Sequence, residues 1–220
     1  SDGDGDNMTY SFEWIEGTST VFVTDTGADS TIDIPTYLGT ELDEGEVVTC
    51  RVIANDSLED GPSAEASSTL NNLPTVAPVL DKDPVPTNST LTCTANGTDS
   101  DGDNLTFAYE WVESAGAVFA TDTGTDSTID IATYLNSDLS EGETVTCRVT
   151  ANDGYQDGLS VEASVAINHQ PTVTPTLDNT PVPTEGTVTC SPNGADGDGH
   201  NLSCSYEWVD GADVVFATDA

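Results

Sequence analysis

The sequence predicts an all-β fold made of tandem β-sandwich modules with a 97-residue period. The first observation behind this prediction is a repeated tract, in which an acidic loop leads into an alternating strand that ends on a tryptophan, at Trp14, Trp111 and Trp208. The second is a series of short strand-like stretches separated by turn residues, which is typical of sandwiches. A fixed period of this length indicates tandem modules, and no segment shows a convincing helical period.

One period is complete and two are partial. We expect a complete module at residues 73–168, a partial module without its opening strands at residues 1–72, and a partial module with opening strands only at residues 169–220. We therefore expect the chain to be a section of a longer array. An alternative is a polymer subunit whose incomplete ends are completed by neighbouring copies through strand donation.

The strands of the complete module follow one another with turn residues between them. Prolines at positions 74, 84 and 86 place the first strand at a sheet edge, because proline cannot donate a hydrogen bond to a ladder. In the third strand, apolar residues at every second position from Leu105 to Trp111 form one inward face. Residues 133–143 are expected to be an irregular acidic connection, and residues 152–158 a turn. The expected strands cover residues 75–80, 89–95, 105–111, 117–120, 127–131, 144–151 and 159–167.

The chain is extremely acidic. It has 3 Lys and Arg residues against 40 Asp and Glu residues, which gives a formal net charge of −37. This balance excludes nucleic acid as a partner, because phosphate binding needs clustered cations, and it argues against anionic membrane surfaces. No apolar run approaches the roughly 20 residues that a membrane span requires. The charge fits solubility in a salty environment, binding of divalent cations, or both.

Three residues carry a resemblance to a known class of domain. Cys93, Trp111 and Cys147 resemble the Cys…Trp…Cys framework of immunoglobulin-like domains. Residues 99–111 together with residues 149–154 resemble the PKD-like and cadherin-like tandem repeats of large bacterial and archaeal surface proteins. The resemblance implies immunoglobulin-like sandwiches in an extracellular or cell-surface protein, where such modules mostly serve as stalks and spacers.

The cysteines of the complete module lie at inward positions of its second and sixth strands. The resemblance implies a disulfide between Cys93 and Cys147, which would join the two sheets beside Trp111. The alternative is a pair of buried free thiols in a reducing compartment. None of the five cysteines has the spacing of zinc ligands.

The other cysteines lie in the partial modules. Cys50 and Cys190 occupy the same two strand positions, and each is expected to pair outside its own module, in continuing sequence or in a neighbouring subunit. Cys204 stands where Phe107 stands in the complete module. We expect it to fill core space, with no visible disulfide partner.

The acidic loops are candidate calcium sites. Asp99, Asp101 and Asp103 place three carboxylates within five residues, where their mutual repulsion costs stability unless a cation is bound. Calcium takes six to eight oxygen ligands, and Gly102 allows the tight turn that brings alternate residues together. The alternative is a solvated acidic turn. The predicted metal ligands are Asp2, Asp4, Asp6, Asp99, Asp101, Asp103, Asn152, Asp153, Asp196 and Asp198.

The resemblance also implies which other residues lie near these loops. In an immunoglobulin-like sandwich the loops after the second and sixth strands lie at the same end, which places Asn152 and Asp153 beside the acidic loop. The linker residues Asn71 and Asn72, and the preceding acidic residues 41–46, are expected at the same end, so bound calcium would stiffen the linker. His200 replaces Asp103 in the third copy and is expected to weaken binding there.

Glycosylation signals also recur in the sequence. Asn-X-Ser/Thr sequons indicate a glycoprotein, although chance matches are common in a chain so rich in Ser, Thr and Asn. The candidate glycosylation sites are Asn7, Asn55, Asn88, Asn96, Asn104 and Asn201.

The combined features favour a structural extracellular protein rather than an enzyme. We expect a rod, stalk or filament of repeated modules, stiffened by Ca²⁺, whose partners are copies of itself or neighbouring modules of the same array. His169 and His200 have no nucleophile motif near them, so we expect no catalysis. The alternatives are an adhesin or carbohydrate-binding module array and the spacer region of a larger secreted enzyme.

Overall fold

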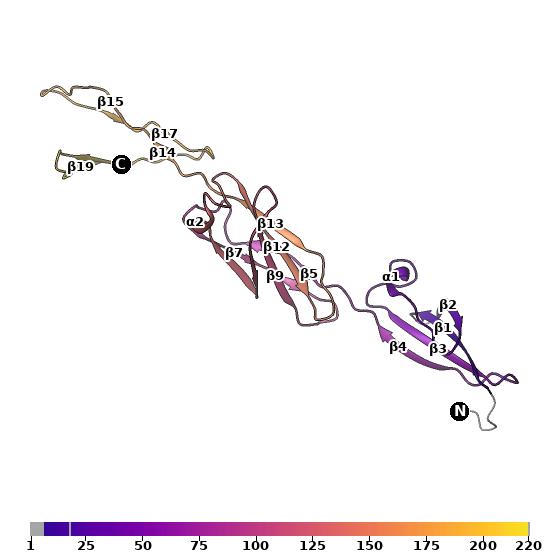
Figure 1. Ribbon diagram of the computed structural model, residues 1–220. Helices are drawn as coiled ribbons and strands as arrows, with labels where there is room; N and C mark the ends of the chain where they lie inside the picture. The colour runs from indigo at the N-terminus through magenta and orange to yellow at the C-terminus, as the bar shows by residue number, and fades with distance from the viewer. Residues whose placement is uncertain (1–6, 18, 220) are drawn as a thin grey trace. The chain divides into compact units, whose positions relative to one another are not determined.

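The structure is a computed structural model that describes residues 7–17 and 19–219, and its fold is all-β apart from two single-turn helices (Figure 1). It forms two compact units that interleave along the sequence. The first unit contains the described residues up to Val76 together with Gly97–Thr106 and Thr150–Leu159. The second contains Ala77–Asn96, Phe107–Val149 and residues 160–219. The predicted ligands Asp2, Asp4 and Asp6 lie outside the described residues.

The first unit is built on one antiparallel sheet with the strand order β2-β1-β3-β4. Trp14 on β1 lies opposite Cys50 on β3, so both side chains are on the same face of the sheet. On the same two strands, Arg51 lies opposite Glu13 and binds it at 2.9 Å. The elements are β1 (Thr9–Glu16), β2 (Thr20–Thr26), α1 (Ile34–Tyr37), β3 (Val47–Asn55), β4 (Ala64–Thr69), β5 (Thr75–Val76) and β8 (Gly97–Thr98).

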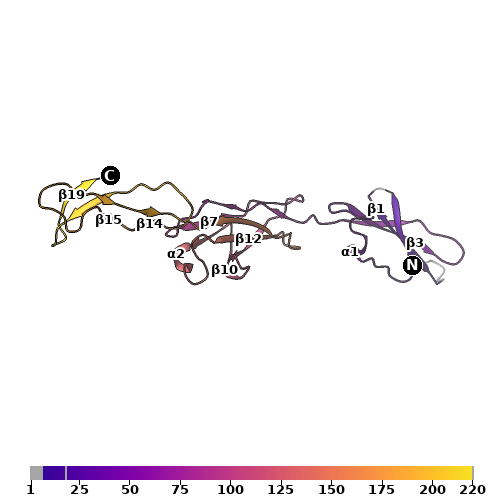
Figure 2. The same ribbon diagram turned by 90° about the horizontal axis from the view of Figure 1, so that it is seen from above.

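The central residues form a two-layered sandwich, whose layers can be followed in Figure 2. One sheet has the order β10-β9-β12-β13 and the other the order β11-β7-β6. The small strands β5 and β8 pair with each other. The elements are β6 (Val79–Leu80), β7 (Thr90–Thr94), β9 (Thr106–Val112), β10 (Val118–Thr123), β11 (Asp126–Asp130), α2 (Ile131–Tyr134), β12 (Thr144–Asn152) and β13 (Val161–Ala166).

The sandwich core contains the predicted cysteine pair and tryptophan. Cys93 on β7 and Cys147 on β12 form a disulfide, and both are fully buried. Trp111 is also fully buried, and its Nε1 donates a hydrogen bond to Ser127 Oγ at 3.0 Å, which satisfies the polar atom of the indole. This strand order, with a disulfide between the sheets and a tryptophan beside it, confirms the predicted immunoglobulin-like sandwich.

In the C-terminal part of the second unit, up to residue 219, the strands form three separate pairs, β14-β17, β15-β16 and β18-β19. Leu177 on β15 lies opposite Cys190 on β16, as Leu80 lies opposite Cys93 in the sandwich. The elements are β14 (Thr172–Val173), β15 (Thr176–Leu177), β16 (Cys190–Ser191), β17 (Gly194–Ala195), β18 (Tyr206–Val209) and β19 (Val215–Asp219). Within the described residues, no helix is long and apolar enough to cross a membrane.

Three local details differ from the sequence predictions, and one of them is the short strand β8, which lies outside every expected strand. The expected strand at residues 75–80 is divided into β5 and β6, because Pro78 between them cannot donate to a ladder. The helix α2 overlaps the expected irregular connection, and the Asp130 side chain caps it by accepting from the backbone N–H of Ala132. A four-residue helix is too short to show a helical period in the sequence.

Candidate metal-binding loops

Two acidic loops, residues 99–103 and 196–200, have the same local structure. In the first, Asp99 Oδ1 accepts hydrogen bonds from the backbone N–H groups of Asp101 at 2.9 Å and Asp103 at 3.2 Å. In the second, the Asp196 carboxylate receives the equivalent bonds at 3.0 and 3.1 Å. Gly102 has φ +82°, a conformation that suits glycine and turns the chain back toward the carboxylate.

The first loop gathers carboxylates around an unsatisfied oxygen. One ligand atom from each of Asp99, Asp101 and Asp103 lies within 4.8 Å of the others. Asp99 Oδ2 is buried and has no hydrogen-bond partner. Burial raises the pKa of Asp103, and the negative charges of Asp99, Asp101 and Asp153 raise it further. The loop is therefore a concentrated negative site with an oxygen that accepts nothing from the protein.

The first linker, residues 71–73, is hydrogen-bonded to carboxylates of this site. Asn71 Nδ2 donates to Asp153 Oδ2 at 2.7 Å, and this bond, followed by the backbone N–H of Gln156, lowers the pKa of Asp153. Asn72 donates through its backbone N–H and its Nδ2 to the two oxygens of Asp101, at 2.7 and 2.8 Å. Because three linker donors meet two acidic side chains, the linker conformation depends on the charge of this loop.

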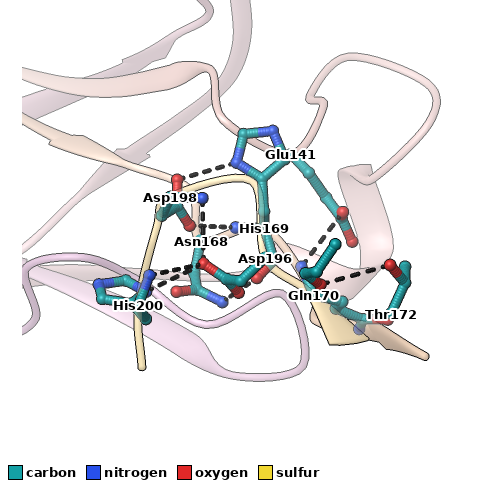
Figure 3. Close-up of polar contacts among 9 residues, drawn as sticks. Glu141, Asn168, His169, Gln170, Thr172, Asp196, Asp198 and His200 are labelled. Carbon is teal, nitrogen blue, oxygen red and sulfur yellow. Dashed lines mark hydrogen bonds and ion pairs between the residues drawn. The ribbon is translucent and has the colours of Figure 1, made fainter. Parts of the chain in front are cut away.

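The second linker, residues 168–170, repeats this arrangement with an imidazole (Figure 3). The backbone N–H of His169 donates to Asp198 Oδ2 at 2.6 Å, and His169 Nδ1 lies 2.8 Å from Asp198 Oδ1. The backbone N–H of Gln170 donates to Glu141 Oε2 at 3.3 Å, just as the N–H of Leu73 donates to Glu44 at 3.2 Å in the first linker. The two linkers therefore share a bonding pattern that recurs after 97 residues.

The remaining predicted ligands differ in the residues that they contact. Asn152 is bonded within its own turn, because its Nδ2 donates to Asp157 at 2.8 Å and its Oδ1 accepts from the backbone N–H of Gly154. Asp196 and Asp198 come together with His200, whose Nδ1 lies 3.5 Å from Asp196 Oδ1. His169 was not predicted as part of the second loop, although its position 97 residues after Asn72 was the signal that could have identified it.

The basic side chains of the chain are paired elsewhere. Arg51 binds Glu13 and Glu65, and Arg148 binds Glu110 and Glu162, in both cases across neighbouring strands. Lys82, the third cation, binds its neighbour in sequence, Asp81. None of these three cations is paired with a carboxylate of the first acidic loop.

The sequon asparagines are mostly accessible. Asn55 is half-buried, and its Nδ2 donates to Asp60 at 2.8 Å, so its amide is already engaged. The exposed ones are Asn7, Asn88, Asn96, Asn104 and Asn201.

The bond between His169 and Asp198 predicts a pH-dependent second linker. This bond raises the pKa of His169 above its ordinary value of 6.5 and lowers the pKa of Asp198. While Asp198 is ionised, the contact therefore contributes its full stabilisation below pH 6.5, and this is lost as the pH rises through the folded-state pKa of His169. It is also lost as the pH falls through the lowered pKa of Asp198. An NMR titration of His169 should show the raised pKa, and Asp198→Asn should return it toward 6.5. An unchanged His169 pKa in that variant would contradict the assignment.

Comparisons with known proteins give structural likenesses only. No protein-family profile matches the sequence, and no curated protein matches it. A two-domain fibronectin type III segment from chicken tenascin has a TM-score of 0.36 and 10% identity, over 72% of this chain and 83% of that chain. The amphioxus IgVJ-C2 molecule has a TM-score of 0.30 and 15% identity, over 72% of this chain and 88% of that chain. The strand order of this chain and its buried Cys93–Cys147 disulfide define the immunoglobulin-like fold class.

Proposed function

We propose that this chain is a segment of an extracellular structural array, and that Ca²⁺ bound by its first acidic loop holds the following sandwich to its linker. The sandwich fold and its internal disulfide suit a structural or adhesive module array outside the cell. The observation that carries the calcium part is the buried Asp99 Oδ2, which has no partner and lies in a cluster of three carboxylates. Tandem repeats of the PKD-like or cadherin-like kind remain the class we favour.

The residues of the first loop fit a hard divalent cation. Asp99, Asp101 and Asp103 offer carboxylate oxygens, the ligands that Ca²⁺ prefers. Asp153 adds a fourth negative charge close enough to raise the pKa of Asp103. Calcium would neutralise this charge, and Asn71 and Asn72, which are bonded to Asp153 and Asp101, would be fixed with it.

The second loop fits the same ion less well. His200 stands in place of the third carboxylate, and imidazole nitrogen is a poor ligand for calcium. Both oxygens of Asp198 are bonded to His169, just as both oxygens of Asp101 are bonded to Asn72, so the difference between the two loops is His200. The proposal therefore assigns stronger calcium binding to the first loop than to the second.

Calorimetric titration with Ca²⁺ tests this proposal on the whole chain. We expect Asp101→Asn to remove one binding event or weaken it at least tenfold, because it deletes a ligand charge and leaves the sandwich core unchanged. The matched control is Asp122→Asn, which removes an exposed charge from β10 that is not part of either carboxylate cluster, and should leave binding unchanged. Equal calcium binding by the parent chain and by Asp101→Asn would refute the calcium part of the proposal.

A further inference from the structure

The second acidic loop, residues 196–200, has a nitrogen ligand in place of a third carboxylate. One carboxylate oxygen from each of Asp196 and Asp198 and one ring nitrogen of His200 lie within 4.8 Å of one another. His200 Nδ1 lies 3.5 Å from Asp196 Oδ1, so the imidazole is turned toward the carboxylates (Figure 3). Two ligand atoms on a tetrahedral Zn²⁺ ion, each bonded at about 2.1 Å, are about 3.4 Å apart. The loop therefore holds a nitrogen and an oxygen close to the spacing of zinc ligands.

Asp196 provides a buried oxygen that the protein leaves without a partner. Its side chain is only 4% exposed. Its Oδ1 accepts hydrogen bonds from the backbone N–H groups of Asp198 and His200, whereas its Oδ2 accepts none from the residues that the structure describes. Removing an ionised oxygen from water without giving it a partner costs free energy. A bound cation would offset this cost, so the oxygen points to a positively charged ligand in the loop.

The linker residue His169 holds the second carboxylate in place. Its backbone N–H and its Nδ1 contact the two oxygens of Asp198 at 2.6 and 2.8 Å. The ring lies so close to Gly142 and Gly197 that a side chain at either position would collide with it. Each carboxylate oxygen keeps a further lone pair for a cation, and carboxylates that bind metals are commonly hydrogen-bonded in this way. His169 is therefore a positioning residue for Asp198.

We infer that residues 196–200 bind a divalent transition-metal ion, represented by Zn²⁺, through Asp196, Asp198 and His200. A site that combines imidazole with carboxylates suits zinc and similar ions, whereas calcium prefers oxygen ligands alone. Three protein ligands leave one position of a tetrahedral ion for water. All three ligands and His169 belong to the second unit. This inference goes beyond the proposed function and does not depend on calcium binding.

Metal bound to this loop would also fix the second linker. His169 is bonded to Asp198, and the next linker residue, Gln170, donates to Glu141 and Thr87. An ion on Asp198 would therefore hold a linker that is already bonded on both sides. Two acidic loops 97 residues apart would then select different cations, because an aspartate at position 103 is replaced by a histidine at position 200.

Zinc titration of the whole chain without an affinity tag, followed by calorimetry and by NMR of the histidine rings, tests the inference. Cys50, Cys190 and Cys204 are replaced by Ser in every protein, because free thiols bind zinc themselves. With calcium in excess, we expect one zinc-binding event that shifts the ring resonances of His200. His200→Asp, which recreates the carboxylate pattern of the first loop, should lose this event. His169→Asn should keep it with an affinity lowered about tenfold, as expected for a residue that orients a ligand.

The first loop offers the reciprocal variant. Asp103→His places an imidazole at the position that His200 has in the second loop, and it should create a second zinc-binding event. Asp122→His is the matched control. It adds an imidazole to β10, outside both carboxylate clusters, and should add no binding event.

Three results would overturn the inference. They are unchanged His200 resonances in the presence of zinc, equally tight zinc binding by the parent chain and by His200→Asp, and displacement of zinc by an equal concentration of calcium. The first of these would show that His200 forms only an ion pair with Asp196, and it is measured on a chain that keeps both loops intact. Asp101→Asn should lose calcium binding and keep the zinc event, so failure of the calcium proposal is distinguishable from failure of this one.

Discussion

Removal of the Cys93–Cys147 disulfide should lower the unfolding free energy of the sandwich by about 4 kcal/mol. The bond closes a loop with a sequence separation of 54 residues, and the chain-entropy relation gives about 4 kcal/mol for a loop of this size. The two residues belong to opposite sheets and are fully buried beside Trp111. The loss is a large fraction of the stability that a single small domain has, typically 5–15 kcal/mol.

The measurement is urea unfolding of Cys93→Ser/Cys147→Ser, monitored through Trp111. Replacing Trp14 and Trp208 by Phe makes Trp111 the only indole that reports on the transition. Cys204→Ser is the matched control, because it changes a half-buried free thiol and should leave the Trp111 transition in place. Equal midpoints for the disulfide-free chain and its parent would show that the bond contributes little to the sandwich.

Calcium should stabilise the same sandwich when it is present well above its dissociation constant. At 100 times that constant, a ligand that binds only the folded state adds about 2.7 kcal/mol to the unfolding free energy. The Trp111 transition should therefore move to higher urea with calcium and return with chelator. Asp101→Asn should lose this shift, whereas Asp122→Asn should keep it. A transition that is insensitive to calcium in the parent chain would contradict the prediction.

Replacing Asp103 should have opposite effects on the unfolding free energy with and without calcium. Its folded-state pKa is raised above 3.8, so the folded state favours the protonated form, and stability without metal should increase as the pH falls through the raised pKa. Asp103→Asn removes the repulsion permanently. We expect this variant to be more stable than the parent chain in chelator at neutral pH, and less stable than the parent when calcium is abundant. If it were destabilised in both conditions, a structural role for Asp103 would replace the metal role.

The fold was predictable because its signals are local and repeat along the chain. The alternation from Leu105 to Trp111 sets one buried face, and the 97-residue spacing of Trp14, Trp111 and Trp208 indicates that the same face recurs. The break at Pro78 and the single turn of α2 were missed. Their causes are one absent N–H group and one capping carboxylate at Asp130, which are too short in range to produce a pattern.

The candidate site was only partly predictable. The spacing of Asp99, Asp101 and Asp103 identified the cluster, because a turn brings alternate residues together whatever surrounds it. The engagement of Asn152 with Asp157 could not be read from the sequence, since several acidic groups near it were equally available. The bonds of His169 to Asp198 depend on how the second linker meets the loop, and this is a property of tertiary structure.

The recurring linker bonds also constrain how such a chain can vary. Glu44 and Asp101 bind adjacent linker residues, Leu73 and Asn72, and Glu141 and Asp198 do the same for Gln170 and His169. One residue inserted into or deleted from a linker would shift its N–H donors away from their carboxylate acceptors. The exchange of Asn72 in the first linker for His169 in the second keeps the spacing and replaces an amide by an imidazole. Connectors of constant length can therefore exchange an amide for an imidazole and keep the same bonds to the acidic loop, without any change in the domains they join.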